Sequence, residues 1–149
     1  MYINSFMKYF PRKIRFPKGK SFFLWGPRQS GKTTLLKQCY PQAYRIDLLR
    51  TDDRIRYEQA PHRLREVLRA LPADQRVVID EIQKVPALLD EVHYAIQEEG
   101  RCFTLCGSSA RKIRRSHANP LGGRALKRAL LGFSAIELDK VFSLDRMLK

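Results

Sequence analysis

One run of residues has the types and spacing needed to hold a chain of phosphates. It fits the pattern G-x-x-x-x-G-K-[ST] at every required position and, with the residue that follows, consists of Gly26, Pro27, Arg28, Gln29, Ser30, Gly31, Lys32, Thr33 and Thr34. An apolar run at 22–25 precedes it and a helix-like run follows it, which is the strand–loop–helix context that the pattern requires. The sequence therefore predicts that residues 26–34 bind a nucleoside triphosphate.

The chemistry of a triphosphate explains this spacing. Gly26 and Gly31 allow the backbone to turn sharply and to approach the phosphates without a Cβ in the way. The N–H groups of the loop then point inward, and the positive end of the following helix faces the same anion. We expect the Lys32 amine to reach the β- and γ-phosphates, and the Thr33 hydroxyl to bind Mg²⁺, which prefers oxygen ligands.

Two adjacent acids follow an apolar run later in the chain. Asp80 and Glu81 come directly after residues 77–79, and Asp80 is 48 residues beyond Lys32. Acids after a strand are common on protein surfaces, but their place in a chain of alternating strands and helices favours a functional role. We expect Asp80 to share the Mg²⁺ site with Thr33, and Glu81 to accept a proton from an attacking water.

Hydroxyl side chains follow the next apolar run. Ser108 and Ser109 come directly after Gly107. If that run is a neighbouring parallel strand, its end lies at the same sheet edge as the loop and the two acids. One hydroxyl then contacts the γ-phosphate or the attacking water, or it only caps the helix that follows. The residues alone leave both interpretations open.

Alternating apolar and amphipathic runs predict the elements that position these side chains. Strands are predicted at 22–25, 44–48, 76–79 and 102–106, and helices at 32–39, 53–59, 61–71, 86–98 and from about 135. Residues 125–131 fit a strand or a helix equally well. Short apolar strands separated by helices indicate an α/β fold with a mainly parallel sheet, and place the ligand at the carboxyl ends of the strands.

Length and composition suit a single globular domain. The chain has 149 residues, of which 44% are hydrophobic. We divide it into a basic lead-in segment at 1–20 and a P-loop domain at 21–149. No apolar run is long enough to span a membrane, and residues 1–7 lack the features of a signal peptide, so we expect a cytoplasmic location without membrane contact.

The net charge of +14 is distributed unevenly. Residues 1–46 carry ten Lys or Arg residues and no acid, 47–99 carry eight basic and twelve acidic residues, and 100–136 carry eight basic residues and no acid. Two basic segments therefore flank an acidic one, which suggests DNA, RNA or another polyanion as a partner. A surface that is basic only for solubility explains the same pattern, and the sequence does not decide between them.

Taken in order, the motifs resemble those of a prokaryotic group of AAA+-type ATPases. Residues 26–36 resemble its Walker A segment, 78–83 its Walker B segment and 107–111 its sensor-1 segment. Gly123-Arg124-Ala125 and residues 131–138 resemble two later motifs. The resemblance covers roughly residues 20–140, and the ordered set is far more specific than any single motif.

This resemblance implies a three-layer P-loop NTPase fold with the sheet order 5-1-4-3-2. It implies ATP and Mg²⁺ as ligands, with Asp80 as the Mg²⁺ acid, Glu81 as the base and Ser108 as the sensor. Arg124 is either an arginine that meets phosphate charge across a contact in a homo-oligomer or an ordinary surface residue. The same order places the two acid-free segments side by side around the nucleotide, because strands one and four become neighbours.

One departure from the resemblance affects the expected activity. Members of the group continue into a helical lid and a further C-terminal domain, and we expect this chain to lack both. Since lid closure commonly completes such sites, we expect ATP binding to survive better than hydrolysis.

We therefore expect an ATP-binding AAA+-type domain with Mg²⁺-dependent hydrolysis, in which Lys32, Glu81, Ser108 and Arg124 are the candidate catalytic residues. The alternative is a nucleic-acid-binding module with a vestigial ATPase site. A kinase is disfavoured, because the acid pair favours water as the nucleophile and no acceptor-binding pattern is present.

Overall fold

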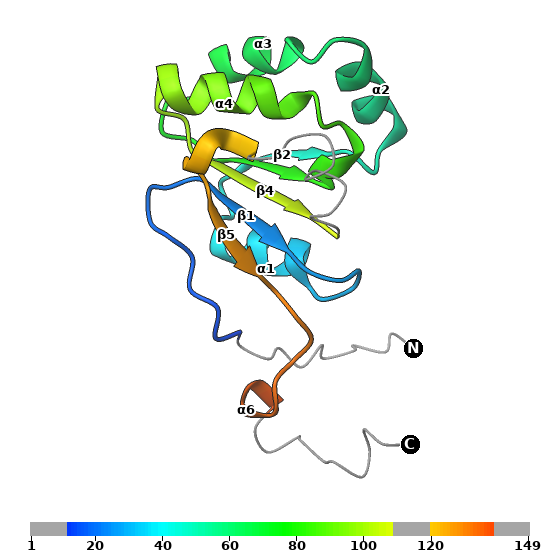
Figure 1. The fold of residues 1–149 in the computed structure, drawn as a ribbon, viewed down its shortest axis with the longest axis vertical. Coiled ribbons are helices and arrows are strands. Elements are labelled where there is room, and N and C mark those ends of the chain that lie inside the picture. Colours follow the sequence, from blue (N-terminus) through cyan, green and yellow to red (C-terminus); the bar gives the residue numbers. More distant parts are fainter. Residues whose placement is uncertain (1–11, 109–119, 139–149) are drawn as a thin grey trace, which may run out of the picture.

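The computed structural model describes residues 12–108 and 120–138, which fold around one parallel β-sheet (Figure 1). The strands are β1 (Phe22–Trp25), β2 (Tyr44–Asp47), β3 (Val77–Asp80), β4 (Phe103–Gly107) and β5 (Leu126–Ala129). Their order across the sheet is β2-β3-β4-β1-β5, which is the order expected from the resemblance. All four pairings are parallel, so every strand ends at the same edge of the sheet.

The register of the strands brings the predicted site residues to that edge. Trp25 pairs with Gly107 and with Ala129, and Asp47 pairs with Asp80. The open question for residues 125–131 is settled as a strand, because Leu126–Ala129 pairs along the whole length of β1. The third and fourth strands each lie one residue later than predicted, so Asp80 and Gly107 are the last residues of β3 and β4.

The helices follow the predicted pattern with shifted boundaries. They are α1 (Lys32–Cys39), α2 (Thr51–Gln59), α3 (Arg63–Arg69), α4 (Leu88–Glu99) and α6 (Ala135–Leu138), with one-turn 3₁₀ helices η1 (Ile82–Lys84) and η2 (Pro120–Gly123). Helix α2 begins two residues earlier than predicted, because Arg50 is extended and Asp52 and Asp53 fall in the first turn. Residues 60–62 and 85–87 form turns rather than the first residues of α3 and α4.

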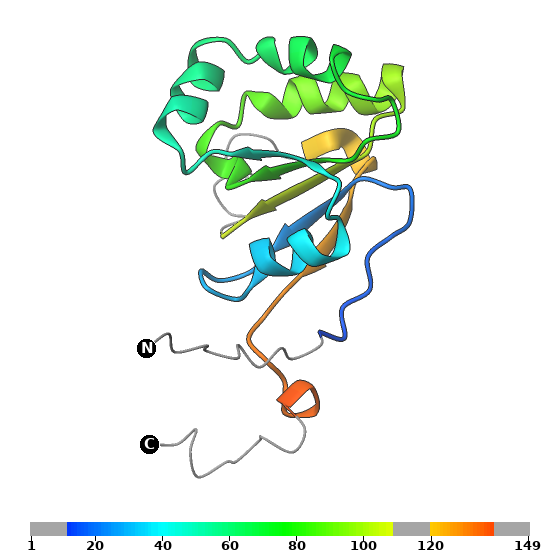
Figure 2. The same ribbon diagram turned by 180° about the vertical axis from the view of Figure 1, so that it is seen from behind.

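Apolar side chains fill both faces of the sheet and give three layers. On one face α2, α3 and α4 cover a cluster built on Phe23, Ile79 and Leu105. On the other face α1 covers Phe22 and Leu24. Figures 1 and 2 show α2–α4 above the sheet and α1 below it in both views. Consecutive residues of β1 thus pack into opposite layers, as expected of a strand buried on both faces.

The described ends of the chain lie on the side of α1 and β5. Ser134 and Glu137 form a capping box at the start of α6, in which the Ser134 N–H donates to Glu137 Oε2 at 2.9 Å and the Glu137 N–H donates to Ser134 Oγ at 3.3 Å. Residues 12–20 form no helix or strand, and Ile14 and Phe16 pack on the cluster beneath α1. Within the described ranges no helix is both long and apolar enough to cross a membrane.

Candidate nucleotide-binding site

The loop between β1 and α1 is held tightly against its neighbours at Gly26. The Gly26 N–H donates to the carbonyl of Gly107 at 3.3 Å, which continues the β1–β4 ladder into the loop. A Cβ at Gly26 would lie 2.0 Å from the carbonyl oxygen of Leu130, so only glycine fits there. Gly31 has a φ of 84° and precedes the first residue of α1, in the left-handed region that favours glycine. Glycine is therefore needed at both positions, at Gly26 because of a close backbone contact and at Gly31 because of its positive φ.

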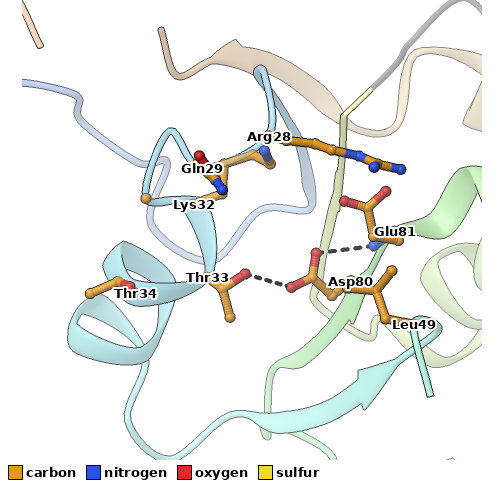
Figure 3. A pocket seen from close by; sticks show the side chains of 9 residues that line it. Arg28, Gln29, Lys32, Thr33, Thr34, Leu49, Asp80 and Glu81 are labelled. Carbon is orange, nitrogen blue, oxygen red and sulfur yellow. Dashed lines mark hydrogen bonds between the residues drawn. The ribbon is translucent and has the colours of Figure 1, made fainter. Parts of the chain in front are cut away.

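A cavity of about 490 Å³ opens at this loop (Figure 3). It is lined by Arg28, Gln29, Gly31, Lys32, Thr33, Thr34, Leu49, Asp80 and Glu81. Six of the nine predicted nucleotide-binding residues and both predicted acids thus border one space. Gly26, Pro27 and Ser30 do not line it. Leu49, which follows β2, is the lining residue that the motifs did not indicate.

The Lys32 amine lies inside the loop. Its Nζ donates to the carbonyls of Gly26 and Pro27, each at 2.8 Å, and the residue is only 6% exposed. It forms no ion pair with any residue in the described part of the chain. Because its hydrogen-bond partners are neutral carbonyls, the positive charge of Lys32 favours an anionic ligand in the cavity.

Thr33 and Asp80 both line the cavity and contact each other. The Thr33 hydroxyl donates to Asp80 Oδ2 at 2.7 Å (Figure 3). The other carboxylate oxygen, Oδ1, accepts the Glu81 N–H at 3.0 Å and the thiol of Cys106 at 3.0 Å. Burial raises the pKa of the Cys106 thiol well above its ordinary value, and the adjacent Asp80 carboxylate raises it further, so Cys106 remains a proton donor.

The oxygen ligands at the cavity fit Mg²⁺. Thr33 and Asp80 supply a hydroxyl and a carboxylate oxygen on one side of the cavity. Among the described residues no group of three or more His, Cys, Asp or Glu side chains forms a closed metal cage. Mg²⁺ commonly takes one or two protein oxygens and completes its shell with substrate phosphates and water, so this sparse set suits it.

Glu81 is buried beside the cavity in a constrained conformation. It is 8% exposed, and its φ of 55° lies in the left-handed region, which is uncommon for a residue with a side chain. Its carboxylate accepts hydrogen bonds from the Gln83 amide and from the Ser108 hydroxyl, the latter at 3.2 Å. The Gln83 amide also lies 3.1 Å from Ser108 Oγ. The structure therefore fixes the predicted base from two separate elements, η1 and the end of β4.

Gln83 is the last residue of the segment that resembles Walker B, and the sequence predicted no role for it. It is 9% exposed and lies over the end of β4, where a Cβ on Gly107 would be 2.0 Å from Gln83 Oε1. The glycine at 107 is thus required for Gln83 to reach Glu81. Cys106 was missed as well. A sequence signal exists for Gln83, since it is polar, lies two residues beyond Glu81 and follows the apolar Ile82.

A second cavity of about 280 Å³ adjoins Glu81. Its lining residues are Arg28, Arg54, Glu58, Glu81, Gln83, Lys84 and Ser108. Arg28 and Glu81 also line the first cavity, so these two residues border both spaces. Ser108 lines the second cavity and donates to Glu81, but it does not line the first cavity, so its role as a sensor stays a prediction. Ser109, the other candidate hydroxyl, lies outside the described residues.

Arg124 does not reach the site of its own chain. Leu126 pairs with Phe22 at the start of β1, so Arg124 lies about six residues of strand, or about 20 Å, from Gly26. A Cβ on Gly122 would lie 2.7 Å from an Arg124 guanidinium nitrogen, so the side chain bends over η2. The distance of Arg124 from the phosphate loop could not be predicted from its place beside a glycine motif, because the register of β5 on β1 determines that distance.

Comparison with known proteins agrees with this geometry. Residues 18–138 match the family described as AAA domain. No curated protein matches the chain by sequence. The family is one of P-loop ATPase-like proteins that bind ATP, and the match includes the loop, both acids and all five strands. The parallel sheet, the phosphate loop and this match lead to one conclusion: the chain belongs to the AAA domain family.

Proposed function

We propose that this chain binds ATP together with Mg²⁺ and hydrolyses it. The observation that carries the proposal is the 2.7 Å contact between Thr33 Oγ1 and Asp80 Oδ2, with Glu81 held beside it. These two oxygen ligands come from different elements and border the same cavity as the charged Lys32. This arrangement suits phosphoryl transfer, in which positioning and charge stabilisation do most of the work.

Each residue of the site has a separate role in this proposal. The loop N–H groups and Lys32 bind the β- and γ-phosphates, and Thr33 and Asp80 hold Mg²⁺. When bound, Mg²⁺ neutralises phosphate charge and orients the phosphate oxygens. Glu81 accepts a proton from water as the water oxygen bonds to the γ-phosphorus. The bond from that phosphorus to the bridging oxygen breaks, and ADP, inorganic phosphate and one proton are released.

Gln83 and Ser108 act on Glu81 in this scheme. Their hydrogen bonds fix the carboxylate on the side of the second cavity, so that its position does not depend on solvent. Any contribution from Arg124 requires a second copy of the chain, because its own site is out of reach. Only the proposed role of Arg124 therefore requires a homo-oligomer. Measuring the molar mass of the protein in solution, with and without ATP, tests whether one forms.

Substitution of Glu81 tests the proposed hydrolysis. We expect Glu81→Gln to keep the affinity for a fluorescent ATP analogue, because it leaves the loop and the Thr33–Asp80 pair intact. We expect its rate of phosphate release to fall by about 10²-fold or more, as for loss of a general base. Glu98→Gln, an exposed position on α4, is the matched control. Equal rates of phosphate release in Glu81→Gln and the wild type would exclude Glu81 as the base.

A second candidate function is binding of a polyanion, favoured by the position of the basic residues. The hydrogen bond from Arg128 Nε to the Arg15 carbonyl, at 3.4 Å, brings the lead-in segment beside β5. Residues 12–20 and 120–138 together hold eight Lys or Arg residues and one acid. β5 is an edge strand, and Lys13, Arg15 and Lys127 are exposed. DNA phosphates would be neutralised along this edge.

Salt dependence tests this second function. We expect duplex DNA to bind with an affinity that falls steeply with salt, by a slope of about −0.9 per phosphate contact. Replacing Arg15 and Lys127 with alanine then reduces the slope by about 2. Arg63→Ala, at an exposed position on α3, is the control and leaves the slope unchanged. Absence of detectable binding at about 50 mM salt would reject nucleic acid as a partner.

A further inference from the structure

Arg28 lies at the tip of the phosphate loop. The Ser30 N–H donates to the Pro27 carbonyl at 3.4 Å, which closes a turn with Arg28 and Gln29 as its central residues. Gln29 has a φ of 61°, as the third residue of a type II turn requires. The turn leaves Arg28 exposed, and Figure 3 shows its side chain extending across the site toward Glu81.

The guanidinium of Arg28 has no hydrogen-bond partner among the described residues, unlike those of several other arginines. Arg101 donates to backbone carbonyls of Leu68, Leu71 and Pro72, and Arg45 donates to those of Leu36 and Tyr40. Arg28 forms no hydrogen bond or ion pair with another residue of the described ranges. Its five N–H donors are therefore free to meet a ligand in the cavity.

Arg28 lies between the two cavities, near where the γ-phosphate would sit in the proposed reaction. It lines the first cavity with Lys32, Thr33 and Asp80. It also lines the second cavity with Glu81 and Ser108. A γ-phosphate lying between the loop and Glu81 has the lysine on the loop side, whereas Arg28 spans the opening from loop to base.

We propose that Arg28 is a catalytic residue that stabilises charge on the γ-phosphoryl oxygens from within the same chain. The inference rests on the proposed ATP hydrolysis and deepens it. As the bond to the bridging oxygen breaks, charge spreads over the three remaining oxygens of the phosphoryl group, and a guanidinium matches such oxygens in a bidentate manner. Arg124 cannot supply this charge in its own chain, because it lies at the other end of β5.

Two other roles for Arg28 lead to different results. If it only strengthens binding of the substrate, its removal weakens ATP affinity and leaves the rate at saturation unchanged. If it restrains Glu81 and thereby inhibits the enzyme, its removal speeds phosphate release. A role in the transition state lowers the rate at saturation and leaves ATP affinity nearly constant.

The test compares Arg28→Ala, Arg28→Lys and Arg63→Ala with the wild type. Three quantities are measured for each: the dissociation constant of a fluorescent ATP analogue with Mg²⁺, the rate of phosphate release at saturating ATP, and binding of ADP with Mg²⁺ and aluminium fluoride. The last mimics the phosphoryl group in transit. Arg63 is exposed on α3, away from both cavities, and serves as the control for loss of a surface arginine.

We expect Arg28→Ala to change the affinity for the ATP analogue by less than about threefold and to slow phosphate release by about 10³-fold. It should also lose the extra affinity for ADP given by aluminium fluoride. Arg28→Lys restores a charge without the planar fork, so it should recover only part of the rate. Arg63→Ala should match the wild type in all three measurements.

The outcomes separate this inference from the proposed function. If the wild type hydrolyses ATP and Arg28→Ala does so equally fast or faster, Arg28 is not catalytic and the proposed function stands. If affinity and nothing else is lost, Arg28 is a binding residue. If the wild type releases no phosphate, hydrolysis is rejected. The aluminium fluoride complex then still decides about Arg28, since equal affinity in wild type and variant overturns the inference.

Discussion

Replacing Gln83 with leucine isolates one contact of the site. The two side chains have similar volumes, and Gln83 is 9% exposed, so the change removes the amide with little effect on packing. It deletes the hydrogen bond from the Gln83 amide to the Glu81 carboxylate and the contact at 3.1 Å with Ser108 Oγ. Glu81 keeps the Ser108 hydroxyl as its remaining side-chain donor.

The expected magnitude follows from the charge on Glu81. A hydrogen bond to a charged group contributes about 1.5–3 kcal/mol, and loss of about 2 kcal/mol from an oriented base slows the reaction about 30-fold. The ATP affinity should change less than about twofold, because Gln83 does not line the cavity at the phosphate loop. Single-turnover phosphate release measures the first quantity, and titration with a fluorescent ATP analogue measures the second.

Gln97→Leu is the matched control, since Gln97 is exposed on α4 and far from Glu81 in the chain. Urea denaturation checks that both variants remain folded. Gly107→Ala should reproduce the slow rate, because its Cβ would lie 2.0 Å from Gln83 Oε1 and displace the amide. A folded Gln83→Leu variant that releases phosphate at the wild-type rate would refute the argument that Gln83 positions the base.

Three further predictions concern the loop, the core and the response to pH. Gly26→Ala should abolish ATP binding and lower the denaturation midpoint, because the new Cβ would lie 2.0 Å from the carbonyl oxygen of Leu130. The Cβ of Gly31→Ala would meet no atom within 4 Å, so this variant should lose only about 1–2 kcal/mol of folding stability, because of its positive φ. Arg101→Ala should lower the free energy of unfolding by about 3 kcal/mol, because the carbonyls of Leu68 and Pro72 lose their charged hydrogen-bond donor. The exposed Arg69→Ala should change the free energy of unfolding little, and urea titration checks both variants. The Arg65 hydrogen bond lowers the pKa of Glu91 below its ordinary value of 4.5, so the pair stabilises the fold above that pH and the stability is lost as pH falls through the lowered pKa. Glu91→Gln should therefore show a smaller loss of denaturation midpoint on acidification below about pH 4.5 than the wild type, and an equal loss would contradict this.

Much of the fold could be predicted from the sequence, because its signals are local. The apolar runs before Gly26, Asp80 and Gly107 mark strands, and the loop pattern fixes the strand-to-helix turn. The neighbouring positions of Thr33 and Asp80 followed from placing the phosphate loop and Asp80 at the carboxyl ends of parallel strands. The order of the strands came from the resemblance alone, since the residues of a parallel sheet do not encode which strands are neighbours.

The parts that sequence reasoning missed depend on contacts between distant residues. The position of Gln83 over Gly107 is set by how η1 folds back on the end of β4, and neither residue is unusual by itself. The thiol of Cys106 reaches Asp80 because β3 and β4 are paired. Arginine is a residue type that binds phosphate, but the register of β5 places Arg124 at the opposite end of the sheet.

The central claim is that residues 26–34, Asp80 and Glu81 together form a site for the polyphosphate of ATP. The most direct measurement is calorimetric titration of ATP, with and without Mg²⁺, into the wild type and into Lys32→Ala, with the exposed Lys37→Ala as control. We predict one site in the wild type and in Lys37→Ala, tighter with Mg²⁺, and no detectable binding to Lys32→Ala. Equal ATP affinity in the wild type and in a folded Lys32→Ala variant would contradict the claim.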